Sequence, residues 1–349
     1  MPSPTVTLTT IIDTHALPLA REFRISRGAK THADVVRLTL SCNGVLGRSE
    51  CVPYARYGET TESVIAQIEH FFAEHSAIIS QLLNAMSPKT ISTDSPLFAL
   101  IMEQVPAGAA ANAIDCAMWD WLCKYWQIPI SQLLSLPACD SVVTAQTLSL
   151  DSLTNMQAQA HEMQGAPLIK IKFDNQDVVE KMQAIAAICT TSRFIIDANE
   201  AWSIEQLNAI EPMLVKANVV LIEQPLPAAD DDALLSYTGA IPLCADESCH
   251  TVFTLADLLD KYQAINIKLD KTGGFTSALK LIMAAKEKNL HLMLGCMVGS
   301  SLAMAPNRVL AGYADFIDLD GPLLVRQDID NGYHIHNGII EGHSELLWG

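Results

Sequence analysis

The sequence lacks the features that would direct it to nucleic acid or to a membrane. Its 22 Lys and Arg residues are outnumbered by 39 Asp and Glu residues, giving a formal net charge of −17, and they form no basic run. Because proteins neutralise nucleic-acid phosphates with such side chains, we expect no nucleic-acid partner. No stretch approaches the roughly eighteen apolar residues of a membrane span. The N-terminal MPSPTVTLTTIID has no basic start, so we expect no signal peptide and a cytoplasmic protein.

Paired-ligand and nucleotide-binding motifs are also missing. The nine cysteines include no CxxC pair and stand mostly among apolar residues, which is typical of a reducing compartment. Cys244, Cys249 and His250 flank Asp246 and could form a zinc site, but packing is the better interpretation because the ligand spacing is wrong. No GxGxxG follows a strand pattern and no Walker A motif is present, so nothing indicates a nucleotide fold.

What the 349 residues do contain is a change of pattern near Pro106. The first part alternates apolar and polar residues, with turn signals at Arg27-Gly28 and Asn43-Gly44, and residues 62–87 have helical periodicity. We expect residues 1–108 to form an α+β capping domain, with residues 325–349 returning to pack on it. Residues 109–324 are expected to form a catalytic domain.

Short strand patterns alternate with helix patterns in this second part. Such alternation predicts parallel strands, and eight repeats predict an α/β barrel of the (β/α)₈ type. An open doubly wound sheet is the alternative. The candidate strands are SVVTAQTL, LIKIKF, RFIIDAN, VVLIEQP, IPLCADE, AINIKLD, LHLMLGC and DFIDLD.

A polar residue ends most of these strand patterns, at intervals of about one strand–helix unit. The residues are Lys172, Asp197, Glu223, Asp246, Lys268 and, two units later, Asp318. Active sites of such barrels lie at the C-terminal ends of the strands. Three adjacent carboxylates would repel one another unless a cation lay between them, and Mg²⁺ prefers oxygen ligands. We therefore expect Asp197, Glu223 and Asp246 to bind Mg²⁺, although each alone could be a strand-end cap.

The strand LIKIKF carries Lys170 and Lys172 on one face, because residues two apart in a strand point the same way. Lys172 on strand two and Lys268 on strand six would lie across the ring from each other. We expect burial, the metal and Lys170 to lower the pKa of Lys172 so that it can act as a base. Two bases on opposite faces of a substrate carboxylate's α-carbon would give racemisation or epimerisation. Surface salt bridges are the weaker interpretation, since the neighbouring residues are apolar.

These motifs resemble the enolase superfamily, and within it the muconate-lactonising subgroup. The stretches KIK, DAN, EQP, ADES and NIKLDKTGG stand in the family's order and spacing. The resemblance implies a (β/α)₇β modified TIM barrel with an α+β capping domain, and the metal and lysine roles given above with Lys170 as a catalytic partner. Barrels of this family often form homo-oligomers, so the resemblance leaves open a homo-oligomer of this chain.

The stretch DFIDLDGP places Asp318 and Asp320 on one face of the last strand. It resembles the dipeptide epimerases, in which such a DxD binds the N-terminal ammonium of a small dipeptide. The stretches RYGET, PAGAAANAIDCAMWD, TAQT, CADESCHT and LMLGCM look especially like the L-Ala-D/L-Glu epimerases of murein recycling. A turn before Gly321-Pro322 is the alternative interpretation of the two aspartates.

The remaining pocket residues are assigned from their places beside these motifs. A glutamate side chain on the substrate would need a cation from REFRISRGAK, where we favour Lys30 or Arg24 over Arg27, although an exposed basic turn fits equally well. At the strand ends, we expect Thr147, Cys296 and Met297 to line the pocket. We expect Asn199 and Glu247 to orient the metal ligands or the lysines.

Several alternatives stay open. An o-succinylbenzoate synthase, an N-acylamino acid racemase or a cycloisomerase would share the fold, but none of them needs the DxD. A Schiff-base aldolase needs one lysine and leaves three carboxylates unexplained. The complete set of lysines and carboxylates argues against a catalytically inactive barrel.

Overall fold

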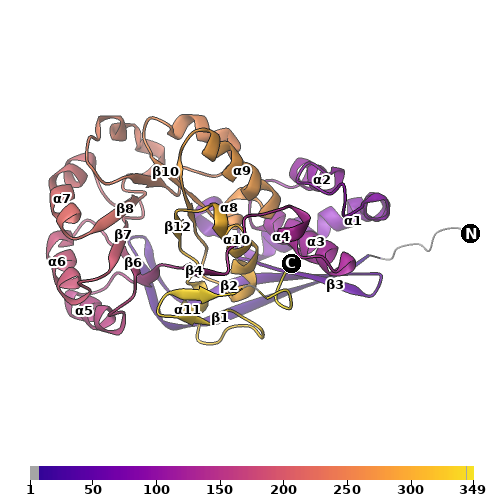
Figure 1. Cartoon of the computed structure of the whole chain (residues 1–349), viewed down its shortest axis with the longest axis horizontal. Coiled ribbons are helices and arrows are strands. Elements are labelled where there is room, and N and C mark those ends of the chain that lie inside the picture. Colours follow the sequence, from indigo (N-terminus) through magenta and orange to yellow (C-terminus); the bar gives the residue numbers. More distant parts are fainter. Residues whose placement is uncertain (1–7, 343) are drawn as a thin grey trace, which may run out of the picture.

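The computed structural model describes residues 8–342 and 344–349, so the start of the first predicted strand, residues 1–7, lies outside the described part. A three-stranded antiparallel sheet begins the chain, in the order β1 (Thr9–Ile25), β2 (Gly28–Cys42) and β3 (Val45–Cys51). The β1–β2 pairing breaks register between Pro18 and Phe23. Helices α1 (Thr61–Ala85), α2 (Pro96–Gln104) and α3 (Ala109–Trp126) follow and lie with β3 at one end of the molecule (Figure 1).

Eight parallel strands form the second sheet, in the order β12-β11-β10-β9-β8-β7-β6-β5. The ring closes where the N–H of Ala145 donates to the carbonyl of Ile317 at 2.8 Å, which confirms the predicted barrel. The strands are β5 (Gln146–Leu148), β6 (Leu168–Lys172), β7 (Arg193–Asp197), β8 (Val219–Glu223), β9 (Leu243–Ala245), β10 (Ala264–Ile267), β11 (His291–Leu294) and β12 (Phe316–Ile317).

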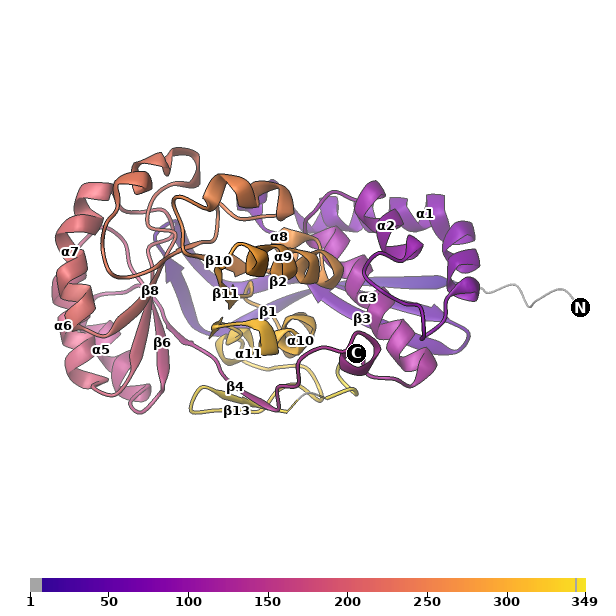
Figure 2. The same ribbon diagram turned by 45° about the horizontal axis from the view of Figure 1, so that its top comes forward.

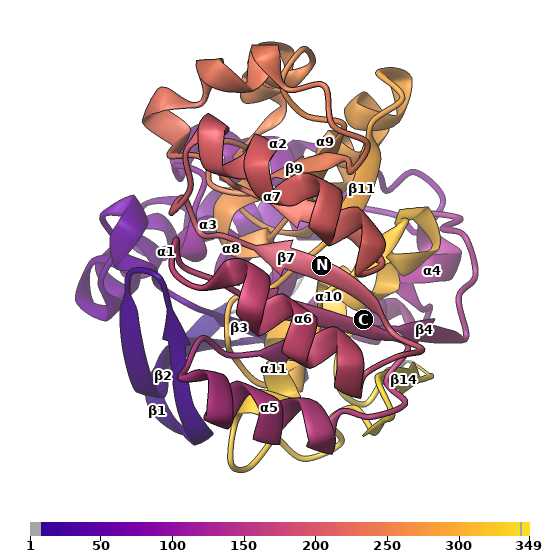
Figure 3. The ribbon, with the colours of Figure 1, turned by 90° about the vertical axis from the view of Figure 1, so that its left-hand side faces the viewer.

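Helices cover the outside of the barrel, and α5, α6 and α7 lie side by side there (Figure 3). The crossovers after β8 and β9 are an exception to the predicted pattern, because 3₁₀ turns replace α-helices. In DDALLSYTG the N–H of Tyr237 donates to the carbonyl of Leu234 at 2.9 Å, an i→i+3 bond. The barrel helices are α5 (Leu153–Glu162), α6 (Val178–Ile188), α7 (Ile204–Lys216), α8 (Leu269–Thr272), α9 (Phe275–Glu287), α10 (Ser301–Val309) and α11 (Gly321–Leu324).

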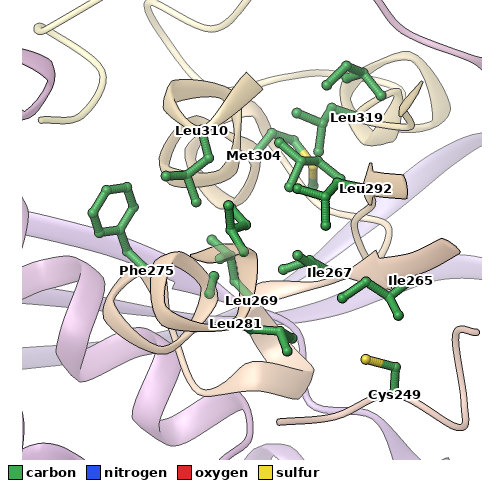
Figure 4. Close-up of a cluster of buried hydrophobic side chains, with 14 of the residues drawn as sticks. Cys249, Ile265, Ile267, Leu269, Phe275, Leu281, Leu292, Met304, Leu310 and Leu319 are labelled. Atoms are coloured by element: carbon green, nitrogen blue, oxygen red, sulfur yellow. The ribbon is translucent and has the colours of Figure 1, made fainter. Parts of the chain in front are cut away.

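The barrel interior is built in layers. A lower layer packs one apolar side chain from nearly every strand into a single cluster, and its members are Ala145, Leu168, Ile195, Leu221, Cys244, Ala264 and Met293. Outside the ring, a larger cluster joins strands to helices, and Ile265, Ile267 and Leu292 point toward Phe275 and Leu281 of α9 there (Figure 4). The two clusters use opposite faces of the same strands, as alternation along a strand requires.

The last residues contact both parts of the molecule (Figure 2). Strands β13 (Ile335–His336) and β14 (Ile339–Glu341) pair with β4 (Ser141–Val143), which leads into the barrel. Trp348 Nε1 donates to the carbonyl of Cys116 on α3 at 2.9 Å. The domain limits at 108 and 325 stay predictions. No helix of residues 8–342 and 344–349 is long and apolar enough to cross a membrane.

Candidate active site

A polar layer stands above the apolar one, two residues further along each strand. Leu168 is followed by Lys170, Ile195 by Asp197, Leu221 by Glu223 and Cys244 by Asp246. Because residues two apart share a face, the side chains that follow the lower layer also point into the ring. The strands therefore change from an apolar interior to a charged one within a single step.

Carboxylates and ammonium groups alternate around this layer, which Lys268 joins from four residues beyond Ala264. Lys170 Nζ lies 3.1 Å from Asp197 Oδ2 and 2.6 Å from Glu223 Oε2. Lys268 Nζ lies 3.9 Å from Glu223 Oε1 and 2.6 Å from Asp246 Oδ2. The three predicted metal ligands are thus brought together, with one ammonium between each neighbouring pair.

Burial and charge act against each other at these groups. Burial would raise the pKa of Asp197 and Asp246, but the nearby ammonium groups outweigh it and lower both pKa values. The pKa of Glu223 rises to about 7 because of its burial and the charge of Asp197. Burial lowers the pKa of Lys170 and Lys268, but the carboxylates outweigh it and raise both. Lys170 and Lys268 are therefore ammonium ions in this arrangement. The lowering expected at Lys172 stays a prediction.

Most of the predicted site residues line one cavity of about 520 Å³. Lys172 and Lys268 both reach it, and Lys172 Nζ also lies 2.5 Å from Asp197 Oδ2. Asp197 and Glu223 are fully buried and are not part of the cavity wall. The other predicted residues in the wall are Thr147, Lys170, Asp246, Asn199, Glu247, Cys296, Met297, Asp318, Asp320 and Lys30.

Asp318 and Asp320 are both buried beside the cavity and have different partners. Asp318 Oδ2 accepts from Lys170 Nζ at 2.8 Å, while Asp318 Oδ1 is buried without a hydrogen-bond partner. Asp320 Oδ2 accepts from the N–H of Thr147 at 2.6 Å. Burial and the charge of Asp318 raise the pKa of Asp320 to about 7. The pair therefore offers a cation an acceptor that the protein leaves unused.

The β1–β2 hairpin closes the cavity from the side of the antiparallel sheet. Lys30 lines the cavity and its Nζ lies 5.3 Å from the centre of the Tyr54 ring. Arg24 does not line it; its exposed side chain pairs with Glu22. Arg27 also lines the cavity, and it fastens the hairpin to the strand ends by donating to Glu247 Oε1 at 2.6 Å and to Glu200 Oε2 at 2.9 Å.

Three buried residues near the carboxylates were not singled out from the sequence. Asn266 Nδ2 donates to Glu223 Oε1 at 2.7 Å. Gln224 Oε1 accepts from the N–H of Asp246 at 2.9 Å, and Lys271 Nζ donates to Asp246 Oδ1 at 2.6 Å. Asn266 had a signal, because NIK on β10 repeats the spacing of KIK on β6.

The cysteines do not form the alternative zinc site. Within residues 8–342 and 344–349, no three His, Cys, Asp or Glu side chains stand in a ready ligand arrangement. His250 Nε2 instead contacts the carbonyl of Glu247 at 3.1 Å, and the His250 ring stands edge-on to Tyr57. All nine cysteines are free thiols.

Comparison with known protein families identifies the family of this chain. Residues 155–341 match the family described as enolase C-terminal domain-like, and residues 7–135 match the mandelate racemase/muconate lactonizing enzyme N-terminal domain. The chain belongs to the enolase superfamily. One family model covers most of the barrel and the other covers the capping sheet. These matches confirm the resemblance seen in the sequence.

Individual relatives narrow the type of enzyme. The chain is 44% identical over 307 residues to the N-acetyl-D-glutamate racemase of Pseudoalteromonas sp., covering 87% of this chain and 91% of that one. It is 38% identical over 325 residues to the L-Ala-D/L-Glu epimerase of Escherichia coli K12, covering 93% and 96%. This member of the enolase superfamily is therefore an isomerase, a racemase or epimerase of amino-acid derivatives.

A solved structure matches over almost the whole chain. It is an enolase family member from Agrobacterium tumefaciens with homology to dipeptide epimerases, with bound sodium and L-Ala-L-Glu and an ordered loop. The TM-score is 0.88 at 38% identity, with 98% of this chain and 100% of that chain covered.

Within the described residues the three predicted carboxylates do not stand in a ready ligand arrangement, because the ammonium groups of Lys170 and Lys268 lie between them, but their chemistry fits a divalent cation. Asp197, Glu223 and Asp246 supply oxygen donors of the kind Mg²⁺ prefers. Glu223 Oε2 is buried and has an ion pair with Lys170 but no hydrogen bond. The two ammonium groups between the carboxylates indicate that this position attracts positive charge.

Proposed function

We propose that the chain is a Mg²⁺-dependent dipeptide epimerase that inverts the C-terminal residue, with L-Ala-L-Glu and L-Ala-D-Glu as its substrates. Asp318 lines the same cavity as Lys172 and Lys268, and its Oδ1 is buried without a hydrogen-bond partner. This observation carries the proposal. An α-ammonium would satisfy that oxygen, because a buried acceptor without a partner costs free energy. The substrate's carboxylate would then lie toward Asp197, Glu223 and Asp246.

Lys172 and Lys268 would act as the two bases. Each would remove the α-proton from one diastereomer, and the opposite lysine, as an ammonium, would then deliver a proton to the other face, as two-base epimerisation requires. A divalent cation on the three carboxylates would offset the second negative charge that develops on the substrate carboxylate. Lys170, which touches Asp197, Glu223 and Asp318, would hold these acids in place and add positive charge beside the reaction.

Lys30 would bind the side-chain carboxylate of the substrate. It lines the cavity, whereas Arg24 does not line it and is paired with Glu22. Arg27 is already occupied by Glu200 and Glu247. Among the basic residues of the hairpin, Lys30 therefore has the position that a substrate glutamate needs. L-Ala-D-Glu is a murein fragment, so the proposal includes murein peptide recycling in the cytoplasm, and nine free thiols suit a reducing compartment.

Racemisation of N-acetyl-glutamate is the second candidate, favoured by the relative at 44% identity. An N-acetyl group has no positive charge and would leave Asp318 Oδ1 unpaired. The two substrates can be compared directly in D₂O with Mg²⁺, following the α-proton of glutamate by NMR and the product by chiral analysis. Faster exchange of L-Ala-L-Glu supports the proposal; faster exchange of N-acetyl-L-glutamate replaces it with the second candidate.

A further inference from the structure

Lys271 is a buried cation that the proposed reaction does not use. Its side chain is 1% exposed and is not part of the cavity wall. Its Nζ donates to the Asp246 carbonyl at 2.5 Å, to Asp246 Oδ1 at 2.6 Å and to the Asn266 carbonyl at 3.1 Å. A substrate in the cavity cannot reach this ammonium, so its role must pass through Asp246.

The short helix α8 fixes Lys271 in place. It directly follows β10, and Gly273 ends it with a φ of 87°, in the left-handed region. Asp270 next to Lys271 accepts from the N–H of Val52 at 3.0 Å and from Asn112 Nδ2 at 2.8 Å. Lys268 thus faces the cavity, Asp270 contacts the capping sheet and α3, and Lys271 contacts Asp246. Because its neighbours are held in this way, Lys271 has little freedom to move away from the Asp246 carboxylate.

The two oxygens of Asp246 are divided between two lysines. Oδ2 faces Lys268, which lines the cavity, and Oδ1 faces Lys271, which does not. A ligand entering from the cavity can displace Lys268 from Oδ2 without touching Lys271. Asp246 would then still share its charge with a fixed ammonium while its other oxygen binds the metal.

We infer that Lys271 is a positioning residue that reserves one oxygen of Asp246 and, through its fixed positive charge, limits how tightly the site binds its divalent cation. This inference rests on the proposed metal role of Asp246. Like charges a few ångströms apart in a buried site repel strongly. Orientation alone matters less here, because Asp246 is also held by Gln224 through its backbone N–H. A neutral residue that hydrogen-bonds to a metal ligand would instead strengthen metal binding, since loss of such a residue weakens it.

The test is Mg²⁺ binding to purified protein by calorimetry, without substrate. Lys271→Met should bind Mg²⁺ more tightly by about tenfold or more, because a buried positive charge has been removed. Lys271→Arg keeps the charge and should bind as the wild type does. Lys181→Met is the matched control, since Lys181 is also buried but donates to the Gln176 carbonyl far from Asp246; it should leave the affinity unchanged.

The outcomes separate this inference from the proposed function. Weaker or unchanged binding in Lys271→Met, or equally tightened binding in Lys271→Arg, overturns the inference and leaves the function standing. A wild type that binds no Mg²⁺ overturns both. If Lys271→Met is too unstable to purify, Lys271→Gln replaces it, and the Mg²⁺-induced rise in Tm is measured instead. That rise should be larger in Lys271→Gln than in the wild type, and a smaller rise contradicts the inference.

Discussion

The lower and upper layers of the barrel interior use the same strands and differ in almost everything else. The lower layer holds Leu168, Ile195 and Leu221 against one another, whereas two residues later the upper layer holds Lys170, Asp197 and Glu223. Apolar burial stabilises the first layer. Burying the second costs free energy, which ion pairing offsets only in part. On each of these strands, the residue that stabilises the fold and the residue that lies at the candidate site are therefore only two positions apart.

The largest effect should come from the two lysines that we propose as bases, at the top of the charged layer. Lys172→Ala and Lys268→Ala should each lower epimerisation by roughly 10²–10⁴-fold, the usual contribution of a positioned acid or base. Each variant should still exchange the α-proton of one diastereomer, and the two should prefer opposite diastereomers. Exchange is followed by NMR in D₂O. Wild-type epimerisation in either variant would refute the two-base assignment.

The apolar layer should respond in stability and not in chemistry. Leu221→Ala should lower the free energy of unfolding by about 2–5 kcal/mol, because it leaves a cavity among close-packed side chains. Leu221→Met conserves volume and should cost less than about 1.5 kcal/mol. Chemical denaturation measures both. Well below Tm, kcat should stay close to wild type, and a large fall in kcat with intact stability would break the separation of the layers.

Changing the acid pair should alter selectivity. Asp318→Asn should lower kcat/KM for L-Ala-L-Glu by about 10–100-fold, since the hydrogen bond from the ammonium would lose its charged acceptor. N-acetyl-L-glutamate offers no ammonium, so its turnover by the same variant is the internal control for damage to Lys170. An equal fall for both substrates would remove Asp318 from ammonium binding.

A buried acid outside the barrel should give the smallest effect. Asp115 on α3 accepts from the N–H of Thr276 at 3.0 Å, and burial raises its pKa to about 7. With a raised pKa, its contribution to stability is complete below its unfolded pKa of about 4 and is lost as pH rises through 7. Asp115→Asn should therefore gain about 1–2 kcal/mol relative to the wild type between pH 5 and pH 8. Parallel pH profiles of unfolding would contradict this.

The sequence predicted the strands and their polar ends because both depend on local alternation. KIK, DAN and EQP reveal which residues leave the apolar layer, and barrel closure then brings them together. Lys271 could not be assigned in this way, since its partner Asp246 lies 25 residues earlier and the contact depends on how α8 turns. The choice of Lys30 over Arg24 also required the hairpin's path, because adjacent basic side chains in a turn look alike in sequence.

The cavity wall has two sources. Lys30 lies on a hairpin that shares no strand with the barrel, and Lys172 and Lys268 lie at the ends of barrel strands. Substitutions in the hairpin can therefore alter which molecules are admitted while the lysines at the strand ends stay unchanged. Such an arrangement allows a duplicated gene to acquire a new preference through a few changes in one exchangeable segment.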